Sequence, residues 1–266
     1  MNAESKTKQV SEWAKMPIGW IQGGGLSAFT NRSLDWMGQE KFSRKQQNES
    51  IAALKLYLVL CIRTDYETGF AKVTYEELVR LSGMSKPIVA SSLKKLEAEN
   101  LIRRKPQPLR EGSSIYLEGW LEENFSGRIP KRWLFDGNRG MTIVRLAELN
   151  FSRGTLNLLK VYLALIAFRD RNRNGLAILS YTKLALVTGI GRHLIGDAIT
   201  LLYHFDLISF RQADFTGDDP DRTNRYLIKG LGIAWTALGQ EYPSLKSTSQ
   251  PSKAAIQANI GFVSKR

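Results

Sequence analysis

The hydrophobic pattern along residues 50–117 predicts a fixed order of short elements. An apolar run from Ser50 to Asp65 has the length of a helix, and Phe70–Val73 is rich in strand-forming residues. Two amphipathic helices follow, and then two short strands, Leu101–Lys105 and Ser114–Leu117, on either side of a loop rich in Pro and Gly. The predicted order is therefore helix, strand, helix, helix, strand, loop, strand.

Capping signals mark the ends of the two amphipathic helices. Thr74 followed by Glu77 forms a capping box at the start of the first helix, and Gly83 suits the left-handed residue that ends it. Ser85 can cap the second helix, where Pro87 in the first turn costs little. These signals predict a helix–turn–helix with its tight turn at Gly83.

The second of these helices has an outer face of small and basic residues. Val89, Leu93 and Leu96 form its buried stripe, which leaves Lys86, Pro87, Ala90, Ser91 and Lys94 outside. Small and basic side chains on such a helix suit the major groove of DNA. The alternative interpretation is an ordinary helical hairpin with solvated lysines.

The same pattern returns in the second half of the chain. LKLYLVLCIRTD from Leu54 is matched by LKVYLALIAFRD from Leu159, and the two copies then continue at a constant offset that pairs Gly83 with Gly189. Ser180 takes the place of Thr74 and can cap in the same way. The residues that match are caps, turn glycines and core positions, so the repeat predicts two copies of one fold.

The predicted fold class is therefore mainly α with small β wings (α+β), built as two tandem winged helix-turn-helix domains. These domains cover residues 50–117 and 154–238. We expect residues 1–49 to form a partly ordered N-terminal arm. Residues 118–153 are expected to form a linker packed through Trp120 and Trp133, and residues 239–266 a disordered basic tail.

Charge points to a polyanionic partner. The 266 residues carry a formal net charge of +13, with a pI of about 9.8. No segment approaches the ~18 uninterrupted apolar residues of a membrane span, and the N-terminus lacks the apolar core of a signal peptide. The single cysteine, Cys61, lies in an apolar run, which indicates a buried side chain and fits a reducing compartment. We expect a cytoplasmic, nucleoid-associated protein.

Residues for catalysis and metal binding are sparse. His193 and His204 are the only histidines, and neither has cysteine or histidine neighbours at metal-binding spacing. The sequence has no phosphate-binding loop with its lysine and no nucleophile elbow. Asp218, Asp219 and Asp221 lie in a loop, where a solvated turn is the simpler interpretation. We therefore predict a non-enzyme with no cofactor and no metal.

The segment GMSKPIVASSLKKLEAENLIRR resembles the winged helix-turn-helix of many bacterial regulators and replication proteins. Two such domains in tandem resemble the plasmid replication initiators that bind repeated origin sequences. The resemblance implies binding to double-stranded DNA, as a monomer on repeats or a homodimer on an operator, with replication or transcription machinery as further partners. A nicking initiator does not fit, because the required His-hydrophobic-His motif is missing.

Three classes of function remain open. They are a plasmid or phage-type replication initiator, a transcriptional regulator that binds an operator, and a winged-helix protein that bridges other factors. The first two require sequence-specific binding to duplex DNA, and the third does not.

The two predicted reading helices differ in charge. The second has Arg192 and His193 but also Asp197 and Asp206, so we expect stronger DNA binding by the first domain, with a protein contact as the alternative role of the second. The residues expected to contact DNA are Ser85, Lys86, Pro87, Ser91, Lys94, Arg103, Arg104, Lys105, Arg110, Arg192, His193, Arg211, Arg222 and Arg225.

Overall fold

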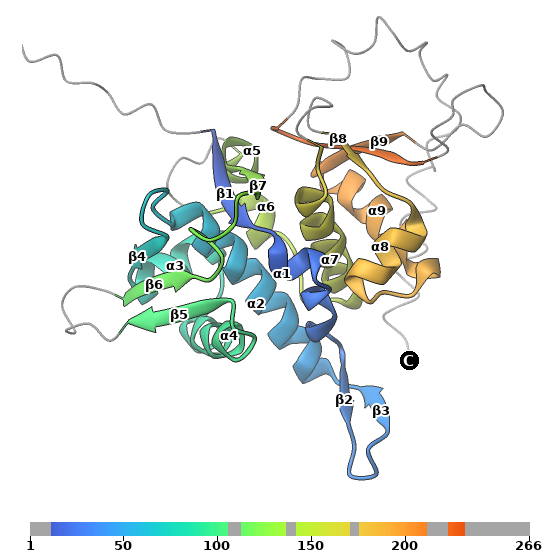
Figure 1. Cartoon of the computed structure of the whole chain (residues 1–266). Coiled ribbons are helices and arrows are strands. Elements are labelled where there is room, and N and C mark those ends of the chain that lie inside the picture. The colour runs from blue at the N-terminus through green and yellow to red at the C-terminus, as the bar shows by residue number, and fades with distance from the viewer. Residues whose placement is uncertain (1–11, 106–112, 137–141, 171–175, 212–222, 232–266) are drawn as a thin grey trace, which may run out of the picture. The chain divides into compact units, whose positions relative to one another are not determined.

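Two long apolar helices, α2 (Arg44–Arg63) and α7 (Arg153–Ala167), contact one another in the computed structural model (Figure 1). The structure describes residues 12–105, 113–136, 142–170, 176–211 and 223–231. Helix α2 begins at Arg44 and not at the predicted Ser50, because the Ser43 hydroxyl caps it by accepting a hydrogen bond from the Gln46 amide. The polar first turns of α2 hid this start in the sequence, since they lack the apolar run that follows.

Each long helix is followed by the same series of elements. After α2 come β4 (Phe70–Val73), α3 (Tyr75–Ser82), α4 (Lys86–Ala98), β5 (Ile102–Lys105) and β6 (Ser113–Leu117). Strand β6 lies between β4 and β5 in an antiparallel sheet, with Lys72 and Lys105 both opposite Ser114.

After α7 come β8 (Leu176–Ile178), α8 (Tyr181–Thr188), the 3₁₀ turn η2 (Arg192–Leu194), α9 (Ile195–His204), β9 (Ile208–Arg211) and β10 (Arg225–Ile228). Here β10 is the central strand, between β8 and β9. The strand order is thus equivalent in the two halves. The predicted α+β class is confirmed, because the described residues form helices and small antiparallel sheets.

The predicted ends of α3 are confirmed, and α8 has the same ones, whereas Ser85 precedes α4 without the predicted side-chain cap, since its hydroxyl accepts no hydrogen bond from the first turn. The Thr74 hydroxyl accepts a hydrogen bond from the Glu77 amide (3.1 Å), and Ser180 does the same for Lys183 (3.1 Å). Gly83 ends α3 with φ 67° and Gly189 ends α8 with φ 65°, in the left-handed region that favours glycine. The same caps thus fix the same turns in both halves.

The stretches expected as an arm and a linker form regular elements. Before α2 lie β1 (Trp13–Pro17), α1 (Gly19–Gln22), the 3₁₀ turn η1 (Gly25–Ala28), β2 (Arg32–Leu34) and β3 (Glu40–Phe42). Before α7 lie β7 (Ser126–Pro130), α5 (Lys131–Phe135) and α6 (Val144–Ala147). Each of these elements is short, and glycine or proline interrupts the series, so no hydrophobic period reveals them.

The expected packing of the two tryptophans is observed. Trp120 is 1% exposed and its indole donates a hydrogen bond to the Tyr66 carbonyl (3.0 Å). The Trp133 indole donates to the Asp206 carbonyl (2.6 Å), so it ties this stretch to the second half of the chain.

The internal repeat extends into these stretches. Residues 15–20 (KMPIGW) align with residues 128–133 (RIPKRW). Strands β1 and β7 pair antiparallel with Lys15 opposite Arg128, which are equivalent positions of the repeat. Because equivalent residues face each other, a local two-fold axis passes through this pair.

The two halves also cover one another. A side chain at Gly83 would lie 3.0 Å from Ala147 of α6, the segment that leads into α7. A side chain at Gly189 would lie 3.3 Å from Ser27 of η1, which precedes α2. Each tight turn is therefore closed by the segment that precedes the other half's long helix.

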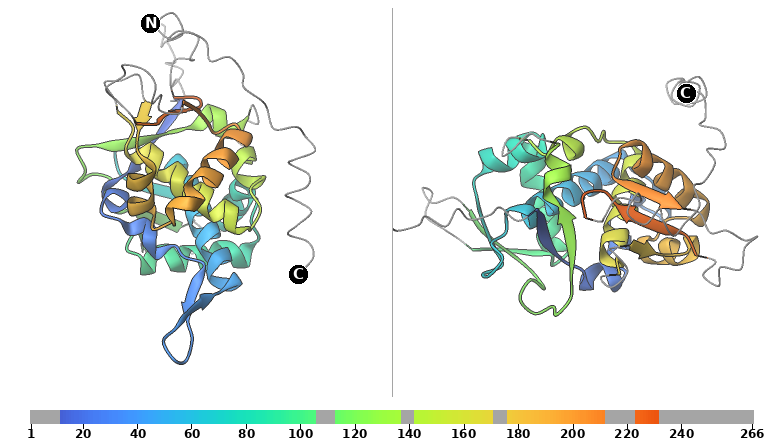
Figure 2. Two further views of the ribbon diagram at one scale, coloured as in Figure 1. Left: turned by 90° about the vertical axis from the view of Figure 1, so that its right-hand side faces the viewer. Right: turned by 90° about the horizontal axis from the view of Figure 1, so that it is seen from above.

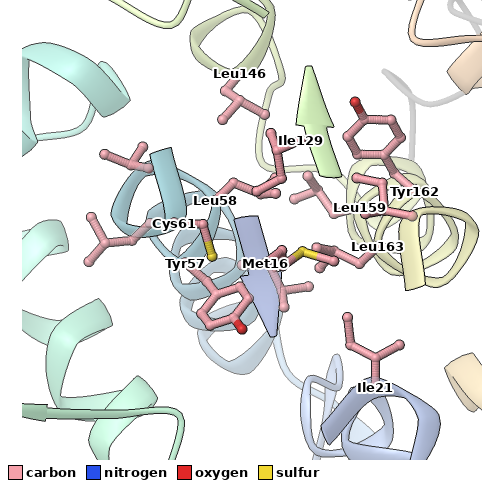
Figure 3. Packing of buried hydrophobic residues seen from close by; sticks show 14 of the residues in the cluster. Met16, Ile21, Tyr57, Leu58, Cys61, Ile129, Leu146, Leu159, Tyr162 and Leu163 are labelled. Atoms are coloured by element: carbon pink, nitrogen blue, oxygen red, sulfur yellow. The ribbon is translucent and has the colours of Figure 1, made fainter. Parts of the chain in front are cut away.

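One core cluster runs through both halves. Figure 3 shows Met16 of β1 and Ile129 of β7 among side chains of α2 and α7, including Leu58 and Leu159. All four side chains are fully buried. Each Å² of apolar surface that they remove from water stabilises the fold by roughly 25 cal/mol.

Candidate nucleic-acid interface

Helix α4 presents a stripe of small residues and one lysine to solvent. Pro87, Ser91, Lys94 and Ala98 are all exposed, and their spacing of four, three and four residues places them on one face. The opposite face, with Val89, Leu93 and Leu96, is buried against α2 and β5. Ser85 and Lys86 are exposed at the start of the helix. The structure thus brings together the five residues predicted on this helix.

An ion pair fixes one flank of α4 to the neighbouring strand. The Arg104 guanidinium of β5 donates to both carboxylate oxygens of Glu97 on α4, with its Nε 2.6 Å from Oε1. This pair holds the pKa of the Glu97 carboxyl below its usual value. Arg104 was predicted as a DNA contact, but its guanidinium is half-buried at the α4–β5 junction and positions the strand.

The outer face of the first sheet is basic. Lys105 and Lys72 both lie opposite Ser114 across the three strands, so their side chains share one face with Arg103. The Lys105 ammonium lies 4.5 Å from the centre of the Phe70 ring, and the Arg103 Nε lies 3.0 Å from a carboxylate oxygen of Glu118. Lys72 was missed in the sequence, because the face of a strand residue depends on a register that only pairing defines.

Ser91 borders a small apolar cavity on the other flank of α4. Its hydroxyl donates to the Ile88 carbonyl (3.0 Å), and both residues line a space of about 260 Å³. The other lining residues are Asn48, Glu49, Ala52 and Phe151. One predicted reading residue therefore lies beside the first turns of α2.

The second half carries different chemistry at equivalent positions. Asp197 occupies the position of Ser91, and Thr200 that of Lys94. Where the first half has the Glu97–Arg104 ion pair, the second has Tyr203 and Phe210 in edge-to-face contact, with ring centres 5.9 Å apart. The exposed face of α9 attracts phosphate less than that of α4, because it carries fewer basic side chains.

The basic residues predicted in the second half are placed as follows. Arg192 and His193 are exposed in η2, just before α9 begins at Ile195. Arg211 and Arg225 lie opposite one another on β9 and β10, and each makes a further polar or ring contact. Arg110, Arg222 and the predicted basic tail lie outside the described residues.

Chemistry of other kinds is limited in the part of the chain that the structure describes. No group of three or more histidines, cysteines or acidic residues there could hold a metal ion. Burial raises the pKa of the Cys61 thiol, which keeps it protonated and unreactive. No single described helix is long and apolar enough to cross a membrane; α8 with residues 192–204 passes that test only as a pair bent by 108°.

Neither a protein-family model nor a curated protein matches the sequence.

Proposed function

We propose that the protein binds double-stranded DNA in a sequence-specific manner, through two winged-helix domains in tandem, and that α4 is the main reading helix. The observation that carries this proposal is the exposed stripe of α4, with Pro87, Ser91, Lys94 and Ala98 on one face. Small side chains let the helix backbone approach base edges, and a lysine can donate to the acceptors of guanine in the major groove.

The basic outer face of the β4–β6–β5 sheet supports the same proposal. Lys72, Arg103 and Lys105 lie together on the face of the sheet that points away from α4, because Arg104, which pairs with Glu97 of α4, alternates with Arg103 and Lys105 along β5. Phosphate contacts of this kind position a protein on the duplex and carry no sequence information, whereas contacts from α4 to base edges do. We assign the attraction of DNA phosphates to the sheet face and the recognition of base sequence to α4.

Among DNA-binding functions we propose a replication initiator of the plasmid or phage type, since the tandem arrangement resembles initiators that bind repeated origin sites. A transcriptional regulator is the second candidate. The local two-fold axis between β1 and β7 favours it, because two halves related in this way suit an inverted repeat.

Selection of bound duplexes from random DNA tests the proposal and separates the candidates. Direct repeats of one short sequence would favour the initiator, and one palindrome the regulator. The absence of any enriched sequence would contradict both, and would favour a protein that bridges other factors.

A matched pair of variants tests which helix reads the DNA. Lys94→Ala should weaken binding to the selected site by about 1–3 kcal/mol and leave non-specific binding nearly unchanged. Thr200→Ala, at the equivalent position of α9, should change the affinity little. Both residues are exposed, so the melting temperature of each variant should match that of the unchanged protein. If Thr200→Ala removes the preference for the selected site over other DNA and Lys94→Ala does not, α9 is the reading helix.

Salt dependence tests the role assigned to the sheet face. Lys72→Ala should weaken binding to all sequences by similar factors. It should also reduce the slope of log K against log salt by about one unit, because one phosphate contact is lost. An unchanged slope would show that Lys72 does not contact the backbone.

A further inference from the structure

The β2–β3 hairpin exposes large apolar side chains without a covering element among the described residues. It projects away from the helices beyond the start of α2 (Figures 1 and 2). Trp36 is 91% exposed, Leu34 68%, Phe42 62% and Met37 61%. Several large apolar side chains exposed on one short hairpin indicate a site of interaction.

The tip of the hairpin is held in one conformation. The Asp35 carboxylate accepts hydrogen bonds from the amides of Met37 and Gln39 (both 2.9 Å), and Gly38 takes the left-handed conformation with φ 73°. Asp35 and Gly38 are sufficient to stabilise this turn. The exposed apolar residues beside them are therefore not needed for the turn to form. Trp36 is thus presented to solvent on a fixed support.

Charge on the hairpin argues against nucleic acid as the occupant. Between Arg32 and Phe42 the two basic residues, Arg32 and Lys41, are balanced by Asp35 and Glu40. Arg32 is moreover paired with Glu40 at 2.6 Å. On a chain of net charge +13, this neutral surface offers phosphate no attraction. For the same reason it is a place where a second, equally basic copy can approach without repulsion.

The cavity beside Ser91 is a complementary feature on the same chain. Its volume of about 260 Å³ lies below the 300–1,000 Å³ typical of small-molecule sites, and its lining includes Ile88, Ala52 and Phe151. A space of this size and polarity suits one large apolar side chain. The cavity begins at Asn48, about 7.5 Å along α2 from the cap Ser43 that follows the hairpin, at 1.5 Å per residue.

We propose that the hairpin and this cavity form a self-association surface, on which two copies of the chain meet about a two-fold axis. Two hairpins that lie antiparallel place each tip beside the base of the other, so Trp36 of each copy enters the cavity of its partner. Such an interface is closed and uses the same patch twice. Trp36 and Phe42 from both copies can bury up to about 150–250 Å² each, which supplies about half or more of the ~1,200 Å² at which stable interfaces begin.

This proposal shares Ser91 with the face of α4 assigned to DNA, because Ser91 also lines the cavity. Its test uses no DNA, so its failure is distinguishable from a failure of the DNA-binding proposal. The full chain, freed of nucleic acid, is studied by sedimentation velocity over a range of concentrations in high salt, which screens the repulsion between copies. A monomer–dimer equilibrium is expected. The proposal would be overturned if the chain stays monomeric at every concentration, up to about 100 times the concentration at which it binds DNA.

Variants on the two complementary surfaces sharpen the test. Trp36→Ser at the tip and Ser91→Phe at the cavity mouth should each raise the dimer dissociation constant at least tenfold. Leu186→Ser is the matched control, because Leu186 is equally apolar and 74% exposed but lies on α8, away from the hairpin and the cavity. Circular dichroism and melting confirm that each variant is folded.

Other outcomes identify a different occupant and reject this one. If Trp36→Ser weakens DNA binding while the chain stays monomeric, the hairpin contacts nucleic acid. If Leu186→Ser dissociates the dimer and Trp36→Ser does not, self-association uses the second half of the chain.

Discussion

Two lysines at equivalent positions of the repeat are buried in the central helices. Lys55 of α2 is 2% exposed and Lys160 of α7 is 4% exposed. The Lys55 ammonium donates to the Leu149 carbonyl (3.2 Å) and lies 5.5 Å from the centre of the Phe151 ring. Burial lowers the pKa of each lysine from 10.5 to about 8. Both lysines therefore cost stability at neutral pH.

The size of this cost follows from the difference between the folded and unfolded pKa values. A difference of about 2.5 corresponds to about 3 kcal/mol per lysine, at 1.36 kcal/mol for each pKa unit. Because the folded pKa is the lower one, the unfolded chain binds more protons between about pH 8 and 10.5. The free energy of unfolding therefore rises with pH in this window, by about 1.3 kcal/mol per lysine from pH 7 to pH 9.

Urea unfolding of the unchanged protein and of Lys160→Met at pH 7 and pH 9 measures this effect. At pH 7 the variant should be the more stable, by up to about 3 kcal/mol, because it removes a buried charge. At pH 9 the gap should shrink by about 1.3 kcal/mol. Other groups that titrate, including Cys61 and the buried tyrosines, are present in both proteins and cancel in the difference.

A gap that stays constant between the two pH values would refute the reasoning, since it would mean that Lys160 has an ordinary pKa in the folded protein. Lys55→Met is a less direct test, because it also leaves the Leu149 carbonyl without its donor.

Two further predictions each compare a pair of matched positions. The Tyr57 hydroxyl accepts from the Trp20 indole (2.9 Å), whereas the equivalent Tyr162 hydroxyl is buried without a hydrogen-bond partner among the described residues. Chemical denaturation should show that Tyr57→Phe costs about 1–3 kcal/mol and that Tyr162→Phe is neutral or stabilising; equal losses would contradict this. Gly83→Ala should lower the melting temperature more than Gly38→Ala, although both positions have positive φ, because only at Gly83 would the new methyl lie 3.0 Å from another side chain. The reverse order would show that the turn at Gly83 relaxes freely.

The sequence predicted features that depend on a few neighbouring residues. Thr74 and Ser180 cap their helices as expected, and Gly83 and Gly189 end them, because each needs only one local hydrogen bond or one backbone conformation. The strand Phe70–Val73 was also identified, since apolar residues mark it.

Features that depend on distant partners escaped prediction. The pairing of β1 with β7 joins two five-residue strands more than a hundred residues apart, and its only sequence signal was the short match between KMPIGW and RIPKRW. Arg104 looked like a free cation in the sequence, because nothing local shows that Glu97 of the preceding helix accepts from it. The apolar cavity at Ser91 arises from three separate segments, so no pattern within one of them reveals it.

The mutual covering of the two tight turns has a consequence for how this chain evolves. A homodimer made from a single half could close both turns with exchanged segments, as Ala147 closes Gly83 and Ser27 closes Gly189 here. In such a homodimer one codon would set both symmetric positions, so neither surface could change alone. A gene that encodes both halves lacks that restriction, and the equivalent positions Lys94/Thr200 and Arg104/Phe210 carry different side chains. The scaffold stays symmetric because each half still completes the other, while the exposed faces are free to specialise.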